Sequence, residues 1–146
     1  MNNKIEFKVC NQGNNVKAYE ECDEFIKKWQ KILKIQDWKI ELHFLSAAEV
    51  ADEIGETGEP GYLAFCTRDH RHKIAKICLN AEHKEINDNM EHTLIHEMLH
   101  IVLSEYQYFY DEVLKSQDEI IKITARMHLE QTINMLADSF WKVVNE

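Results

Sequence analysis

The chain has 146 residues, of which 45% are hydrophobic and 29% charged, and its formal net charge is -9. These values are typical of one soluble globular domain over residues 1–146, and they argue against global disorder. The negative charge argues against a nucleic-acid partner, because phosphate contacts need clustered Lys and Arg, and weakly against an anionic membrane surface. The oligomeric state is left open.

The first fifteen residues contain no continuous apolar segment and no small-residue cleavage site, so we expect no signal peptide. No window reaches the roughly 18 apolar residues of a transmembrane helix. The four cysteines form no CxxC pair, and their spacing does not fit a zinc knuckle. We therefore expect reduced, partly buried thiols in a cytoplasmic protein.

The N-terminal half contains a helix and a strand. Apolar residues at spacings of three and four predict a helix over roughly 16–35. The segment 38–44 alternates apolar and polar residues, which predicts a strand with one buried face. Residues 51–62 contain three of the four glycines and the only proline, which is typical of a loop.

The second half contains a hairpin and two helices. Two strands are expected at about 62–67 and 73–79, joined by a polar turn at 68–72. A helix over roughly 89–104 follows, with Asn or Asp as its N-cap, and then a connector, EYQYFYDE. A long helix covers about 112–144. Grouped strands followed by helices indicate an α+β fold with a small three-stranded sheet, not a parallel βαβ fold.

The segment TLIHEMLHIVL, residues 93–103, is largely apolar but contains His96, Glu97 and His100. Histidines at i and i+4 lie on the same face of a helix, where both can bind one tetrahedral zinc ion. Glu97 points about a quarter turn away, within reach of a metal-bound water. This HExxH pattern is typical of zinc-dependent hydrolysis with the glutamate as general base. Two core histidines bonded to backbone carbonyls are the alternative.

TLIHEMLHIV resembles the extended zincin signature of metallopeptidases. Thr93 stands three positions before the first histidine, and uncharged residues surround the motif. The metzincin continuation needs glycine at position 103 and histidine at position 106, where this chain has Leu103 and Tyr106. The gluzincin branch takes a glutamate from a later helix. In this chain EQTINMLAD resembles that pattern, which implies Glu130 as the third zinc ligand. The resemblance further implies that Asn134 orients His96 through a hydrogen bond.

The residues that share a helix face with Glu130 also favour a ligand role for it. That face carries Ile123, Met127, Asn134, Ala137 and Trp141, and a carboxylate in an apolar row is costly unless it is paired or bound to a metal. The alternative is a solvated glutamate paired with Arg126 or Asn134. Rival third ligands are His128, which would suit a SprT-like protein, and Glu105 or Glu119.

The other candidates are weaker. His70 and His72 are expected to be solvated in the turn, and His92 to lie on the surface of its helix. A peptidase also needs a donor for the oxyanion, and Tyr106, Tyr108 and Tyr110 are left open for this role.

The resemblance implies a minimal zincin of the gluzincin type, like small bacterial or phage metallopeptidases, whose edge strand binds a peptide or protein substrate. The expected cofactor is Zn2+, bound by His96, His100 and Glu130, with Glu97 as catalytic base. The alternatives are a protease specific for one regulatory protein, as in the ImmA-like group, a non-catalytic zinc-binding domain, and a metal-free interaction domain.

Overall fold

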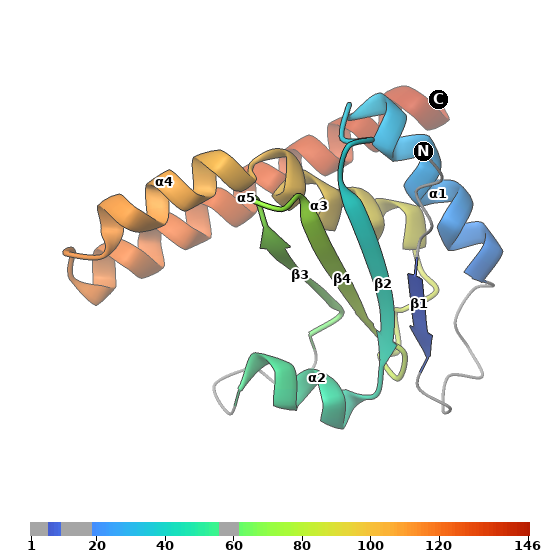
Figure 1. Ribbon diagram of the computed structural model, residues 1–146, viewed down its shortest axis with the longest axis horizontal. Coiled ribbons are helices and arrows are strands. Elements are labelled where there is room, and N and C mark those ends of the chain that lie inside the picture. The colour runs from blue at the N-terminus through green and yellow to red at the C-terminus, as the bar shows by residue number, and fades with distance from the viewer. Residues whose placement is uncertain (1–5, 10–18, 56–61) are drawn as a thin grey trace.

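A mixed sheet is the centre of the fold, seen in a computed structural model that describes residues 6–9, 19–55 and 62–146 (Figure 1). Within these residues the sheet has the strand order β1-β2-β4-β3. Its strands are β1 (Glu6–Val9), β2 (Lys39–Leu45), β3 (Ala64–Asp69) and β4 (Ile74–Asn80). The hairpin β3–β4 and the strand β2 confirm the predicted strands to within about two residues.

The topology corrects the expectation of three strands without a parallel crossover. β1 pairs in parallel with β2, β2 pairs in parallel with β4, and only β3 is antiparallel to its neighbour. The helix α1 (Tyr19–Ile32) follows β1 and precedes β2, so β1, α1 and β2 form a βαβ unit. The sequence of β1 is EFKV, which is too short for its alternation to be recognised. The coarser prediction, that helices combine with a small sheet, is confirmed.

The β3–β4 turn shows why a hairpin forms here without Asn-Gly or Asp-Gly. The Oδ1 atom of Asp69 accepts hydrogen bonds from the backbone N–H groups of Arg71 and His72, both at 3.1 Å. An aspartate side chain that bonds its own backbone in this way replaces part of the usual turn geometry. As a result β3 continues two residues further than predicted, through Arg68 and Asp69.

The helix α2 (Ala47–Ile54) occupies part of the segment expected to be a loop. Ser46 and Glu49 form a capping box, in which Ser46 Oγ accepts from the Glu49 N–H and Glu49 Oε2 accepts from the Ser46 N–H. This S-x-x-E signature was available in the sequence and predicts a helix start. The loop prediction is therefore wrong for residues 51–54, and the glycine-rich remainder at 56–61 lies outside the described residues.

Three further helices complete the second half: α3 (Met90–Val102), α4 (Ser104–Leu114) and α5 (Glu119–Asn145). The predicted side-chain cap of α3 is wrong, because Asn89 has a left-handed φ of 51° and makes no capping bond. The predicted connector is also wrong, since EYQYFYDE lies within α4. Most aromatic side chains of α4 are exposed, so the segment lacks the apolar stripe that identifies a helix.

The sheet is covered on both faces. Residues of β4 alternate between the two faces. Ile77 and Leu79 belong to the main core with α1, α3 and α5. Cys78 packs instead with Leu45 at the end of β2 and with Val50 of α2. Since neighbouring strand residues point to opposite faces, α2 lies on the face opposite α3. The helix α3 packs against α1, α5, β3 and β4, and most of its residues are buried.

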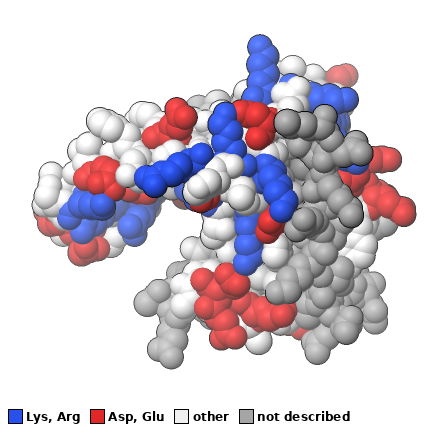
Figure 2. Space-filling model, in the orientation of Figure 1, with Lys and Arg blue, Asp and Glu red and all other residues white. Residues whose placement is uncertain are grey.

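The helices α4 and α5 extend side by side beyond the sheet as an arm (Figure 1). In the space-filling view, the face between this arm and α2 is hollowed, and acidic side chains gather over α2 below the hollow (Figure 2). No helix in the described part of the chain combines the length and apolar character needed to cross a membrane. Of the cysteines in this part, Cys22 and Cys78 are buried and Cys66 is half-buried.

Candidate metal centre

The two histidines of the motif lie one turn apart on the same face of α3. Their ring centroids are 5.3 Å apart, and the side chains of His96 and His100 are 18% and 10% exposed. The buried residues of α3, among them Leu94, Ile95 and Met98, hold the helix between the sheet and α5. The imidazoles consequently project from a rigid, largely apolar support.

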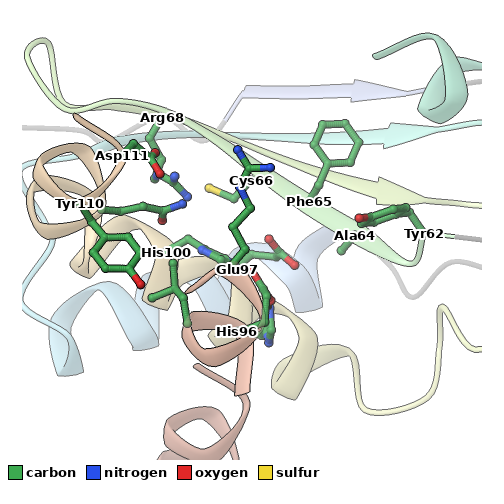
Figure 3. A pocket seen from close by; sticks show the side chains of 14 residues that line it. Tyr62, Ala64, Phe65, Cys66, Arg68, His96, Glu97, His100, Tyr110 and Asp111 are labelled. Atoms are coloured by element: carbon green, nitrogen blue, oxygen red, sulfur yellow. Dashed lines mark ion pairs between the residues drawn. The ribbon is translucent and has the colours of Figure 1, made fainter. Parts of the chain in front are cut away.

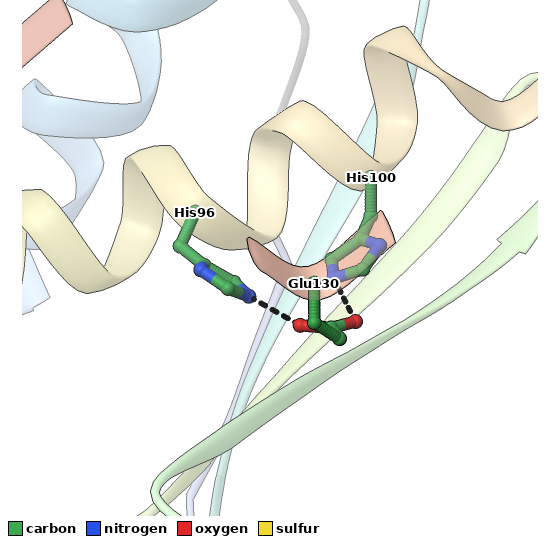
Figure 4. Close-up of side chains that lie close together, drawn as sticks. All are labelled: His96, His100 and Glu130. Carbon is green, nitrogen blue, oxygen red and sulfur yellow. Dashed lines mark ion pairs between the residues drawn. The ribbon is translucent and has the colours of Figure 1, made fainter. Parts of the chain in front are cut away.

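The helix α5 brings Glu130 to these imidazoles. Glu130 Oε2 lies 3.3 Å from His96 Nε2, and Glu130 Oε1 lies 3.3 Å from His100 Nε2 (Figure 4). Ile133 and Ala137 are fully buried, and their packing fixes the face of α5 that meets α3.

The expectation that Glu130 lies in an apolar row is only partly correct. Ile123 and Met127 are 54% and 58% exposed, so the early part of that row faces solvent. Their exposure is explained by the arm, because α5 leaves the sheet in that direction (Figure 1). Glu130 itself is half exposed, and its position depends on the residues that follow it.

The three groups fit a divalent metal. One ligand atom from each of His96, His100 and Glu130 lies within 4.8 Å of the others, and no other such group of three occurs in residues 6–9, 19–55 and 62–146. Zinc bonds of about 2.1 Å place neighbouring tetrahedral ligand atoms about 3.4 Å apart. The two 3.3 Å separations, which join the imidazoles to different oxygens of Glu130, are close to this value, and the three groups could hold one ion.

Glu97 is buried beside this group, with 4% of its surface exposed. Burial raises the pKa of Glu97 to about 7, against the lowering effect of His96 and of the Arg68 guanidinium. A carboxyl group with a pKa near neutrality can both accept and return a proton. Glu97 therefore has the environment of a general base and acid.

The imidazoles differ in their electrostatic surroundings. Burial lowers the pKa of His100 to about 4, so this ring is neutral at pH 7 and keeps a lone pair for a metal. Burial also acts to lower the pKa of His96, yet its net pKa is raised. The main opposing contribution comes from Glu130, and Asn134 adds a side-chain hydrogen bond to the ring. Asn134 thus lies beside the histidine that the resemblance assigns to it.

A cavity of about 550 Å³ opens in front of these groups (Figure 3). Its walls come from α3, β3, α4 and α5, and they include Arg68, Gln107 and Tyr110. Of the three tyrosines left open as oxyanion donors, Tyr110 lines this cavity, and Tyr106 and Tyr108 do not. Arg68 makes no ion pair with any carboxylate of the described residues.

Arg68 and Gln107 are absent from the sequence-based site. The sequence pattern predicts that Arg68 lies in the hairpin turn. Had β3 been extended to Asp69, the period of two would have placed Arg68 on the face of Ala64 and Cys66, which line the same cavity. Gln107 belongs to the predicted connector, and no signal in the sequence indicates a role for it.

The rival ligands lie elsewhere. His128 lines a separate cavity between α4 and α5, and Glu105 and Glu119 do not belong to the histidine group. His92 contacts Asp138 of α5 through Nε2 and Oδ1 at 2.6 Å.

The two turn histidines have neighbours outside the group. His72 pairs with Asp69, and the ring of His70 packs against the ring of Tyr108 in a tilted arrangement with centroids 4.6 Å apart. Among all the candidates from the sequence, the geometry joins Glu130 to the HExxH histidines.

Comparisons with known proteins add no assignment. No protein-family model matches the chain, and neither a curated protein nor a solved structure matches it.

Proposed function

We propose that the chain is a zinc-dependent peptidase of the zincin type, with a site built from α3, α5 and the edge strand β3. The observation that carries this proposal is the convergence of His96, His100 and Glu130 beside the buried Glu97. Three protein ligands with an adjacent carboxylate are characteristic of catalytic zinc sites, whereas structural sites are closed by four protein ligands.

A zinc ion bound by His96, His100 and Glu130 would supply a polarising charge for the scissile carbonyl and an acidified water. Glu97 accepts the proton of the attacking water and later donates it to the leaving amine. The raised pKa of Glu97 keeps both protonation states accessible near pH 7. Asn134 holds the ring of His96 in position through its hydrogen bond.

The edge strand and the cavity support a peptide as the substrate. β3 pairs with β4 on one side and has no other neighbour in the described sheet, so its second row of backbone groups is available to an extended chain. A peptide bound in this way would pass in front of Glu97. Arg68 and Tyr110 can donate hydrogen bonds to the carbonyl oxygen as negative charge develops on it.

Three alternatives to a general zinc peptidase can be compared with the structure. A non-catalytic zinc domain would need a fourth protein ligand, and none is found beside the three within the described residues. A SprT-like site would use His128, which lines a different cavity. An ImmA-like protease for one regulatory protein is a special case of the proposed activity, and it differs only in the range of substrates.

The first test is zinc stoichiometry by elemental analysis for wild type, Glu130→Ala and the matched control His128→Ala. We expect one zinc per chain in wild type and in His128→Ala, and a large loss in Glu130→Ala. Absence of zinc from wild-type protein supplied with Zn2+ would overturn the proposal.

The second test is hydrolysis of a mixed peptide library, followed by mass spectrometry, with Glu97→Gln as the catalytic control. We expect zinc-dependent cleavage by wild type, and a loss of at least 100-fold in Glu97→Gln with its zinc retained. Zinc-loaded wild type that cleaves no peptide of the library would refute a broad peptidase and leave the non-catalytic domain and the protease specific for one regulatory protein.

A further inference from the structure

Two buried polar side-chain atoms lack a regular hydrogen-bond partner among the described residues, and they belong to neighbouring residues of one cavity. They are Nδ1 of His100 and Oε1 of Gln107. Buried polar atoms are nearly always paired, so two of them in the same place need an explanation. They are also complementary, since a protonated Nδ1 donates and an amide oxygen accepts.

The break between α3 and α4 explains how Gln107 reaches His100. Val102 ends α3, Ser104 begins α4, and the Gln107 N–H donates to the Leu103 carbonyl at 2.8 Å in the first turn of α4. The Gln107 side chain acts on the His100 ring as a hydrogen-bonding group, as an amide oxygen facing a ring nitrogen does.

The contact matters because it selects one tautomer of His100. The Nε2 atom faces Glu130 at 3.3 Å, so it must carry the lone pair if the ring is to bind a metal. The proton then resides on Nδ1, which is buried and needs an acceptor. Gln107 Oε1 is the unpaired acceptor at this place.

We propose that Gln107 is a positioning residue for the metal centre: its amide oxygen accepts from His100 Nδ1–H and directs Nε2 toward the metal. This inference rests on the proposed zinc site and deepens it. Each histidine then has an amide partner from a different helix, Asn134 of α5 for His96 and Gln107 of α4 for His100. The short helix α4 thereby becomes part of the site.

The test compares Gln107→Leu, Gln107→Glu and the exposed control Gln117→Leu with wild type. Zn2+ affinity is measured by competition with a chromogenic chelator. The tautomer of His100 is read from imidazole 15N shifts in protein labelled at histidine, both without metal and with Zn2+. Thermal unfolding of the metal-free variants checks that they are folded.

We expect Gln107→Leu to weaken Zn2+ binding about 10- to 100-fold, the range found when the hydrogen-bond partner of a ligating histidine is lost. Gln107→Glu keeps an acceptor and should restore most of the affinity, and Gln117→Leu should bind as wild type does. In metal-free wild type the proton of His100 should reside on Nδ1, and this preference should be lost in Gln107→Leu.

Wild-type affinity in a folded Gln107→Leu, or an unchanged His100 tautomer, would overturn the inference. Failure of the proposed function is a different result. In that case wild type binds no Zn2+, while the tautomer measurement on the metal-free protein still decides whether Gln107 orients His100. Loss of affinity in Gln107→Leu without rescue by Gln107→Glu would also refute the proposed hydrogen bond.

Discussion

Burial of Glu97 predicts that the metal-free protein is destabilised by the ionised carboxylate of this residue. Burial raises the pKa of Glu97 from its ordinary 4.5 to about 7. Between these two values the folded protein binds a proton that the unfolded chain has released, so stability falls as the pH rises through this window. At about 1.4 kcal/mol for each tenfold change in proton affinity, the cost above pH 7 is about 3 kcal/mol.

The substitution Glu97→Gln removes this charge with little change in shape. We expect the free energy of unfolding of Glu97→Gln, relative to wild type, to rise by about 2 kcal/mol between pH 5.5 and pH 8. The measurement is urea denaturation of both proteins in the presence of a chelator at several pH values in this range. Glu105→Gln, on the exposed surface of α4, is the control for the change in net charge.

A difference that stays constant with pH would refute the reasoning. It would mean that the ionised carboxylate of Glu97 is solvated within the cavity, or that Arg68 compensates it fully. The expected result would show that the folded protein loses stability when it keeps the ionised Glu97 carboxylate in an apolar place.

Three substitutions test the packing that holds the site. Ile133→Ala, in the fully buried contact of α5 with α3, should lower the free energy of unfolding by about 2–5 kcal/mol; a loss below 1 kcal/mol in urea denaturation would show that α5 is not packed there. Trp29→Phe removes the 2.7 Å hydrogen bond from Nε1 to Glu91 Oε1 and should cost about 2 kcal/mol, measured in the same way, with Lys28 still paired to Glu91. Phe109→Ser should change stability by less than about 0.5 kcal/mol, because Phe109 is 67% exposed; a drop in thermal stability that grows with protein concentration would show that another chain covers this face.

Most elements of the fold could be predicted where a segment shows its own periodicity. The helix α1, the strand β2, the hairpin and the helix α5 carry patterns of three and four or of two, and all are present. The failures have local causes. β1 is too short to show a pattern. The capping box of α2 lies beside a glycine-rich segment that is typical of a loop, and α4 exposes the aromatic residues that make it resemble a connector.

The sequence by itself determined the arrangement of His96, Glu97 and His100, because the spacing of residues on one helix is a local property of the backbone. Tertiary structure decided where Glu130 meets the two histidines. The register between α3 and α5 depends on how Ile133 and Ala137 pack across the interface. The same holds for Arg68 and Gln107. The end of β3 is set by the local Asp69 turn, but the packing that brings Arg68 and Gln107 to one cavity joins segments far apart in the chain.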